Sequence, residues 1–197
     1  MVEYSKTPIA LVYENILTEY QCNSLINFVK NNNLLFKSEV YNKQTNKIEL
    51  DSVRTSSNCS VFYEEHIVAV EIRKIVSDII KLPIENFEPI QIVRYEVGEH
   101  YGLHYDYFEE GNTDVLDEGG QRLWTAFIYL NDVDSGGETN FVYGGEKIKP
   151  RRGRMVLWRN YFNGKPVKES LHEGLPPISD EKWACNVWIR EGIHKIV

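Results

Sequence analysis

The sequence is poor in cysteine and has no long apolar run. Its three cysteines, Cys22, Cys59 and Cys185, are odd in number and widely spaced, with no CxxC pair among the 197 residues. This pattern excludes a disulfide framework and favours buried thiols in a reducing compartment. No stretch reaches the ~18 apolar residues that a membrane span needs. The first 13 residues show no secretory signal pattern, so a cytoplasmic or otherwise soluble protein is expected.

The sequence also lacks an excess of positive charge. Its formal net charge is −7, which argues against nucleic acid or an anionic membrane as the main partner. One local cluster runs against this balance and comprises Lys147, Lys149, Arg151, Arg152 and Arg154. The cluster is either a solvated face of a hairpin or a docking patch for an acidic substrate.

The chain reads as one domain over residues 1–197, with a helical support over about 1–85 and a β-rich part over about 86–197. Thr18 and Gln21 form a capping box at the start of a first helix, which ends at the polar run 31–33. A second helix is expected over about 64–81 from apolar residues at helical spacing. The polar stretch 37–58 predicts a long mobile loop with a short hairpin.

Short β runs follow from residue 88. The candidate strands are 90–96, 100–106, 122–131, 139–143, 154–160, 167–172 and 182–190. Two helices followed by many strands predict an α+β, mainly β fold whose strands close as a double-stranded β-helix, or jelly roll, with the helices packed on one sheet. Side chains from separate strands can converge at the mouth of such a fold.

His104 and Asp106 stand two residues apart in one of these runs. Residues i and i+2 of a strand point to the same face, so both side chains would enter the barrel together. A carboxylate buried without a partner is costly, and a metal ion removes that cost. Two histidines and one carboxylate are the ligand set of non-haem Fe(II) oxygenase sites. The pair alone can also arise by chance.

His172 would be the second histidine of that set. A lone histidine at a strand end is more often a hydrogen-bonded surface or core residue, as His66 and His194 illustrate. His100 shares the strand parity of His104, so alternation does not exclude it as a ligand.

Lys182 opens the run 182–190. Alternation places Lys182, Ala184, Asn186, Trp188 and Arg190 on one face and four apolar residues on the other. The mixed composition of the first face suits a cavity that holds an anion. The alternative is a structural lysine whose ammonium reaches solvent.

Several ordered motifs resemble those of prolyl 4-hydroxylases. The pattern QIVRYxxGxxYxxHxD over 91–106 is similar to their first metal-binding segment, and RxxTxxxYLN, GGETxF, PxxG and HxGxP follow in the same order before Lys182. Val53-Arg54-Thr55-Ser56 resembles their substrate loop. The resemblance covers about residues 10–192, and one departure is Asp180 where the family usually has glycine.

The resemblance implies an Fe(II)- and 2-oxoglutarate-dependent dioxygenase that hydroxylates prolyl residues at C4 and releases succinate and CO2, with ascorbate as reductant. It implies His104, Asp106 and His172 as the iron ligands and Lys182 as the partner of the far carboxylate of 2-oxoglutarate. Further contacts to this cosubstrate are implied for Tyr95, Thr139 and Trp188, and contacts to a proline-containing peptide for Arg54, Tyr101, Arg122 and Trp188.

Two other interpretations stay open. The first is an oxygenase that acts on another side chain or on nucleic acid, although such nucleic-acid demethylases usually anchor the cosubstrate with arginine rather than lysine. The second is a non-catalytic cupin-like binding module, which would require a decayed metal site. Tyr101 has its own alternative as a packed aromatic of the barrel.

Overall fold

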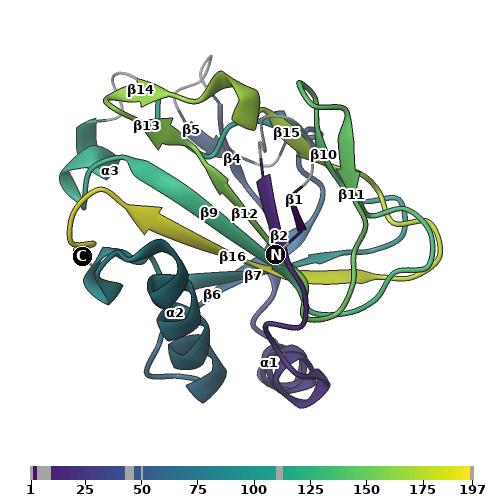
Figure 1. Cartoon of the computed structure of the whole chain (residues 1–197). Coiled ribbons are helices and arrows are strands. Elements are labelled where there is room, and N and C mark those ends of the chain that lie inside the picture. Colours follow the sequence, from purple (N-terminus) through teal and green to yellow (C-terminus); the bar gives the residue numbers. More distant parts are fainter. Residues whose placement is uncertain (1, 4–9, 43–46, 50, 110–112, 196–197) are drawn as a thin grey trace.

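A large and a small antiparallel sheet form the body of the protein, and two helices lie along the outer side of the large sheet (Figure 1). The computed structural model describes residues 2–3, 10–42, 47–49, 51–109 and 113–195. The jelly-roll prediction is confirmed, since sheets with these strand neighbours enclose a core on the inner side of each sheet.

The helices alternate with strands in the first half of the chain and are rare in the second. The α-helices are α1 (Glu19–Asn31), α2 (Ile67–Ile80) and α3 (Thr113–Asp117), and the 3-10 helices are η1 (Ile84–Asn86) and η2 (Lys168–Ser170). The strands are β1 (Val2–Glu3), β2 (Ala10–Tyr13), β3 (Phe36–Lys37), β4 (Val40–Asn42), β5 (Lys47–Glu49), β6 (Ser57–Val61), β7 (Ile90–Tyr95), β8 (Tyr101–His104), β9 (Arg122–Tyr129), β10 (Thr139–Phe141), β11 (Glu146–Ile148), β12 (Met155–Arg159), β13 (Tyr161–Phe162), β14 (Lys165–Pro166), β15 (His172–Gly174) and β16 (Lys182–Arg190).

The large sheet has the strand order β1-β2-β12-β9-β16-β7-β6-β3, and the small sheet has the order β11-β10-β15-β8. The last strand, β16, therefore lies in the middle of the large sheet, between β9 and β7. In the small sheet β15 pairs with β8, and His172 stands directly opposite His104 in the register. This pairing brings residues far apart in the sequence to one place.

Helix α1 begins as its sequence predicts. Thr18 is the N-cap, its hydroxyl accepts from the Gln21 backbone N–H at 3.3 Å, and the Gln21 side chain completes the capping box. The buried face of α1 presents Cys22, Leu25 and Val29 to the large sheet. Helix α2 is shorter than predicted because His66 caps its N-terminus and Lys81 adopts a left-handed conformation at its end.

The two faces of β16 belong to two different cores. Trp183, Cys185, Val187 and Ile189 pack with the helices in the outer core. Ala184, on the opposite face, packs in the inner core between the sheets. The predicted alternation of this strand is confirmed.

The structure differs from the predicted elements in two places. The candidate strand 167–172 is the 3-10 helix η2 followed by β15, because Ser170 and Leu171 donate their N–H groups back to Val167 and Lys168. The stretch 37–58 does contain the hairpin β4–β5, but its last residues enter β6 of the large sheet. Residues 43–46 and 50 of that stretch lie outside the described residues.

The residues before 86 also supply strands β2 and β6 to the large sheet. Strands from both sides of the predicted boundary thus share one sheet. The division into a helical support over 1–85 and a jelly roll over 86–197 stays a proposal. None of the helices that the structure describes combines the length and the apolar character needed to cross a membrane.

The basic cluster is partly neutralised. Arg152 forms an ion pair with Glu19, and Arg154 forms one with Glu14 at 2.7 Å. These pairs support the solvated-face interpretation for those two cations, whereas the interpretation as a docking patch stays untested.

Candidate active site

Two histidines and one carboxylate converge at the junction of β8 and β15. His104 is the last residue of β8, His172 is the first of β15, and Asp106 follows β8 in a bend. Their ligand atoms all lie within 4.8 Å of one another. The His104 Nε2 is 3.7 Å from one Asp106 oxygen, and the His172 Nε2 is 3.8 Å from the other.

Each imidazole is oriented by a hydrogen bond from its Nδ1 to the backbone carbonyl two residues earlier. The Nδ1 of His104 lies 2.8 Å from the carbonyl of Gly102, and the Nδ1 of His172 lies 2.8 Å from the carbonyl of Ser170. Because a carbonyl only accepts, each Nδ1 carries the proton and donates it. Each Nε2 lone pair is then free and faces the Asp106 carboxylate, as metal ligation requires.

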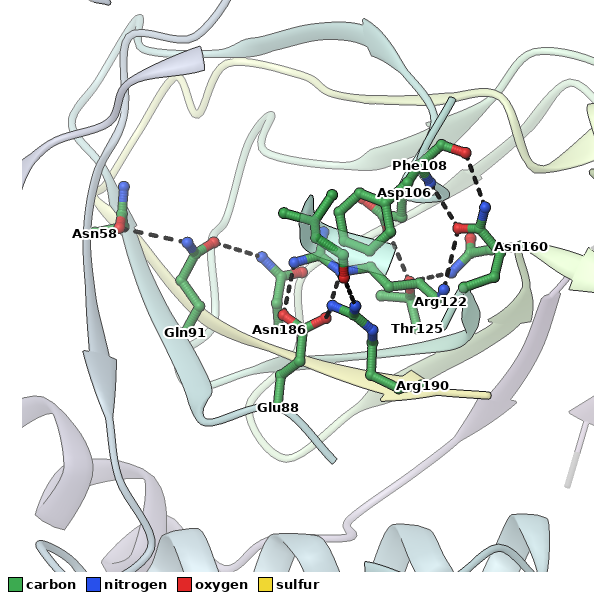
Figure 2. Close-up of polar contacts among 12 residues, drawn as sticks. Asn58, Glu88, Gln91, Asp106, Phe108, Arg122, Thr125, Asn160, Asn186 and Arg190 are labelled. Atoms are coloured by element: carbon green, nitrogen blue, oxygen red, sulfur yellow. Dashed lines mark hydrogen bonds and ion pairs between the residues drawn. The ribbon is translucent and has the colours of Figure 1, made fainter. Parts of the chain in front are cut away.

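The Asp106 carboxylate is held from the opposite sheet. The Thr125 hydroxyl of β9 donates to Asp106 Oδ2 at 2.7 Å, and the Asn160 amide donates to the Thr125 oxygen at 2.7 Å (Figure 2). Thr125 and Asn160 are fully buried. Since Asn160 supplies the proton to one lone pair of Thr125, the single hydroxyl proton is directed toward Asp106.

The protonation states suit a cation. Burial, helped by His172, lowers the pKa of His104 to about 3, so this imidazole is neutral. Burial opposes ionisation of Asp106, but the two histidines and the Thr125 hydrogen bond outweigh it and hold the pKa of Asp106 below its ordinary value. Two imidazole nitrogens and one carboxylate fit the donor set of a non-haem Fe(II) site.

Lys182 lies in the same cavity, whose volume is about 110 Å³. It is fully buried, donates from Nζ to the Gly137 carbonyl at 3.1 Å and lies 4.0 Å from the centre of the Tyr95 ring. Burial lowers the pKa of Lys182 to about 7, against a small opposing effect of Glu138. In the described part of the chain no carboxylate lies within ion-pair distance of this ammonium. An incoming anion would restore its full charge.

The cavity also holds unused hydrogen-bond donors. Trp158 and Trp188 both line the cavity, and their indole N–H groups are buried and have no partner among the described residues. Buried donors without partners are costly, so a ligand with acceptor oxygens would satisfy them. A dicarboxylic keto acid such as 2-oxoglutarate fits this combination of a buried ammonium and free N–H groups.

Tyr95 and Thr139, the other residues predicted for the cosubstrate, both line the cavity and are buried. The Thr139 hydroxyl lies 2.6 Å from the hydroxyl of Tyr129, which is also 2.9 Å from the Ile148 carbonyl. Because the Ile148 carbonyl only accepts, Tyr129 donates its single proton to it, and the Thr139 hydroxyl donates to the Tyr129 oxygen. Tyr129 therefore holds the Thr139 hydroxyl in place. Sequence reasoning assigned no such supporting role to Tyr129.

The residues predicted for the peptide surround the same opening. Tyr101 stacks on the His104 ring with centroids 3.6 Å apart and an interplanar angle of 12°. Arg54 lies 4.7 Å from the centre of the Tyr101 ring and donates to Gln91 at 3.1 Å, which fixes its guanidinium at the cavity wall.

Arg122 and Trp188 form the opposite part of the wall, with the guanidinium 3.7 Å from the indole centre. Glu88 holds Arg122 through two hydrogen bonds of 2.7 and 2.6 Å (Figure 2). Sequence reasoning missed Glu88, which has no motif of its own.

Arg190 corrects the prediction for the 182–190 face. It is fully buried, but it does not line the cavity. Its Nη1 donates instead to Glu88 at 3.0 Å, and its Nε donates to the Gly120 carbonyl. The buried ion pair with Glu88 therefore explains this cation without any ligand.

The other histidines lie outside the cluster. The backbone of His100, which precedes β8, bonds with Thr55, and His66 caps α2. Strand parity does not apply to His100, because it precedes the strand.

Comparison with known proteins agrees with this geometry. A model of the 2OG-Fe(II) oxygenase superfamily matches residues 90–190. The chain is 35% identical over 210 aligned positions to probable prolyl 4-hydroxylase 10 of Arabidopsis thaliana, covering 96% of this chain and 71% of the relative. It is 34% identical to prolyl 4-hydroxylase 5 of the same plant, with the same coverage of this chain and 70% of the relative.

Solved structures show the same fold. A viral collagen prolyl hydroxylase from Paramecium Bursaria Chlorella virus-1, in complex with 2-oxoglutarate, superposes with a TM-score of 0.75 at 30% identity, over 92% of this chain and 96% of that one. A prolyl hydroxylase from Trichoplax adhaerens shares the fold with a TM-score of 0.68 at 17% identity, over 93% and 84%. The chain therefore belongs to the 2-oxoglutarate- and Fe(II)-dependent oxygenase superfamily and, within it, to the prolyl 4-hydroxylase family.

Proposed function

We propose that this protein hydroxylates prolyl residues at C4 in a peptide or protein, using Fe(II), O2 and 2-oxoglutarate and releasing succinate and CO2. One observation carries the proposal: the His-Asp-His cluster and the buried Lys182 line a single cavity. Ascorbate is the expected reductant that keeps the iron divalent.

His104, Asp106 and His172 would hold the metal through Nε2, one carboxylate oxygen and Nε2. When bound, Fe(II) would supply the activation of O2 that couples decarboxylation of the cosubstrate to oxidation of a C–H bond. Thr125 occupies Asp106 Oδ2, which leaves Oδ1 as the available ligand atom. The carbonyls behind both imidazoles would keep the two rings aligned.

Lys182 would bind the far carboxylate of 2-oxoglutarate. A buried ion pair is stable only when hydrogen bonds satisfy the remaining acceptors. Tyr95 and the free indole N–H of Trp188 are the candidates for those bonds. Thr139 would contribute by turning its hydroxyl proton from Tyr129 to the ligand.

The polypeptide substrate would enter past Arg54, Tyr101, Arg122 and Trp188. The relatives support a proline-containing partner: one is a collagen prolyl hydroxylase, and the Trichoplax enzyme is complexed with a peptide fragment of the hypoxia inducible factor oxygen degradation domain. Oxidation of another side chain or of nucleic acid is the runner-up, and the site of the added oxygen separates it from the proposal.

The test supplies the protein with Fe(II), 2-oxoglutarate, ascorbate and a library of proline-containing peptides. The expected result is the mass gain of one oxygen atom on proline, with succinate formed in step. The His172→Ala variant should form no succinate, whereas His100→Ala, which alters a nearby histidine outside the cluster, should retain turnover. An oxygen gained only on other residues would overturn the prolyl assignment, and full turnover by His172→Ala would overturn the iron assignment.

A further inference from the structure

Four tyrosines from three separate segments gather beside the cavity opening. Tyr105 and Tyr107 follow β8, Tyr143 lies in the turn between β10 and β11, and Tyr161 begins β13. These four residues are called the tyrosine platform. Long stretches of chain separate the three segments, so the fold brings the rings together.

The platform is one connected set of rings. The ring centroids of Tyr105 and Tyr107 are 4.7 Å apart, and those of Tyr107 and Tyr161 are 6.4 Å apart. Burial, Tyr107 and the side chain of Tyr143, which lies close by, together raise the pKa of the Tyr105 hydroxyl. Aromatic pairs at these distances stabilise each other and keep the rings in a fixed arrangement.

Core packing does not account for the platform. None of its four residues belongs to either hydrophobic core, Tyr143 is 60% exposed, and the other three are partly exposed. Two apolar neighbours, Val142 and Phe162, are exposed as well. Exposed aromatic clusters of this kind mark sites of interaction.

The platform is continuous with the cavity. Tyr105 lines the cavity together with His104, Asp106 and His172, and Tyr107 and Tyr161, which do not line it, extend the ring contacts from Tyr105 beyond the cavity. The distances from the Tyr105 ring to the Tyr107 ring and from there to the Tyr161 ring add up to at most the length of about three to four residues of a polyproline II helix, at ~3.1 Å per residue. A chain whose target residue lies at the metal cluster would therefore pass its next residues over these rings.

We propose that the tyrosine platform is a binding subsite for a proline-rich polyproline II segment on one side of the target residue. This inference rests on the proposed function, since it takes the occupant to be the polypeptide substrate. Proline-rich segments dock on aromatic surfaces because they are already extended and lose little conformational entropy. Tyrosine adds a hydroxyl that can bind the peptide carbonyls, which have no internal partners in this conformation.

The test compares two substrates: a long proline-rich peptide that can cover the platform, and a short one that contains only the target proline and its immediate neighbours. We expect the double variant Tyr107→Ala/Tyr161→Ala to raise the KM of the long peptide about tenfold relative to that of the short peptide. The corresponding Phe double variant, which keeps the rings and loses only the two hydroxyls, should show a clearly smaller rise. Tyr20→Ala, at an 81% exposed tyrosine on α1, is the matched control.

Binding is measured independently of turnover. Without O2, the enzyme loaded with Fe(II) and 2-oxoglutarate should bind the fluorescein-labelled long peptide about tenfold more weakly when both rings are removed. An unchanged Kd and an unchanged ratio of KM values in the Ala double variant would overturn the platform alone, provided that wild type oxidises the short peptide. Failure of wild type to oxidise either peptide would overturn the proposed function and the platform with it.

Discussion

The two ends of the cavity are built in opposite ways. At the metal end, His104 and His172 lie on strands of four and three residues, and hydrogen bonds to backbone carbonyls and to Thr125 orient all three ligands. At the other end, Lys182 opens the nine-residue β16 in the middle of the large sheet, and its ammonium makes a single hydrogen bond among the described residues, to the Gly137 carbonyl. One end is organised by polar partners and the other by burial.

The difference shows where each end is vulnerable. The ligands at the metal end are already oriented by hydrogen bonds, so metal affinity should fall when a supporting hydrogen bond is lost as well as when a ligand is lost. The ammonium at the other end is only partly charged near neutral pH and depends on its anion. Its properties should therefore follow pH and cosubstrate concentration.

The largest effect is expected from His104→Ala. This variant removes one of only three ligands, so its affinity for Mn(II), a non-oxidisable substitute for Fe(II), should fall by more than the about 10- to 100-fold that a supporting residue costs. Calorimetric titration of the metal-free protein measures the affinity. His100→Ala should bind Mn(II) as wild type does, and an undiminished affinity in His104→Ala would contradict the assignment of this ligand.

Lys182→Ala tests the other end. Truncating one partner of a buried charge pair costs several kcal/mol, which corresponds to a rise on the order of 100-fold in the KM for 2-oxoglutarate. Metal affinity in the absence of 2-oxoglutarate should be unaffected, because Lys182 contacts none of the three ligands in the described structure. Lys147→Ala, in the exposed basic cluster, is the control. A variant with wild-type KM would show that another group binds the cosubstrate.

Thr125→Val should produce an intermediate effect at the metal end. Valine keeps the shape of threonine but leaves Asp106 Oδ2 and the Asn160 amide without their partner. We expect a roughly 10-fold loss of Mn(II) affinity. Thr125→Ser, which keeps the hydroxyl, should recover most of it. Equal affinities in the Val and Ser variants would mean that the hydroxyl does not position Asp106.

The smallest effect, for a change of one pH unit, is a pH dependence of cosubstrate binding. Lys182 has its pKa lowered to about 7 in the free protein, and a bound carboxylate raises it again. Affinity for 2-oxoglutarate is therefore highest below pH 7, where the ammonium is charged before binding, and falls as pH rises, by up to about tenfold per pH unit. Tyr95 and Glu138 are the other titratable groups beside it, and Tyr95 stays neutral because burial raises its pKa to about 12. A flat binding profile from pH 7 to 9 would contradict this expectation.

Sequence reasoning succeeded where a regular pattern governed the structure. The alternation along 182–190 separated the cavity face from the outer core because β16 is long and straight enough to keep its period. The capping box fixed the start of α1 because its hydrogen bonds are local. The ordered motifs brought His172 to His104 and Asp106, which alternation alone could not do.

It failed where the decisive partner is distant in sequence. Arg190 was assigned to the cavity face because the sequence of 182–190 gives no sign of its ion-pair partner. That partner is Glu88, which lies 102 residues earlier in the chain. The support of Asp106 by Thr125 and Asn160 joins three elements of the fold and leaves no local signal. A strand was expected to begin at residue 167, but backbone hydrogen bonds form the 3-10 helix η2 there, and β15 begins only at His172.

The position of β16 has a consequence for biosynthesis. Both of its neighbours, β7 and β9, are made long before it, and they cannot be joined until residues 182–190 have left the ribosome. Until then the nascent chain exposes two unpaired strand edges in what becomes the centre of the large sheet (Figure 1). Such edges are templates for association with other chains. A ribosome stalled just before Lys182 would therefore present an aggregation-prone intermediate, and this makes the last strand a point at which chaperones are expected to matter most.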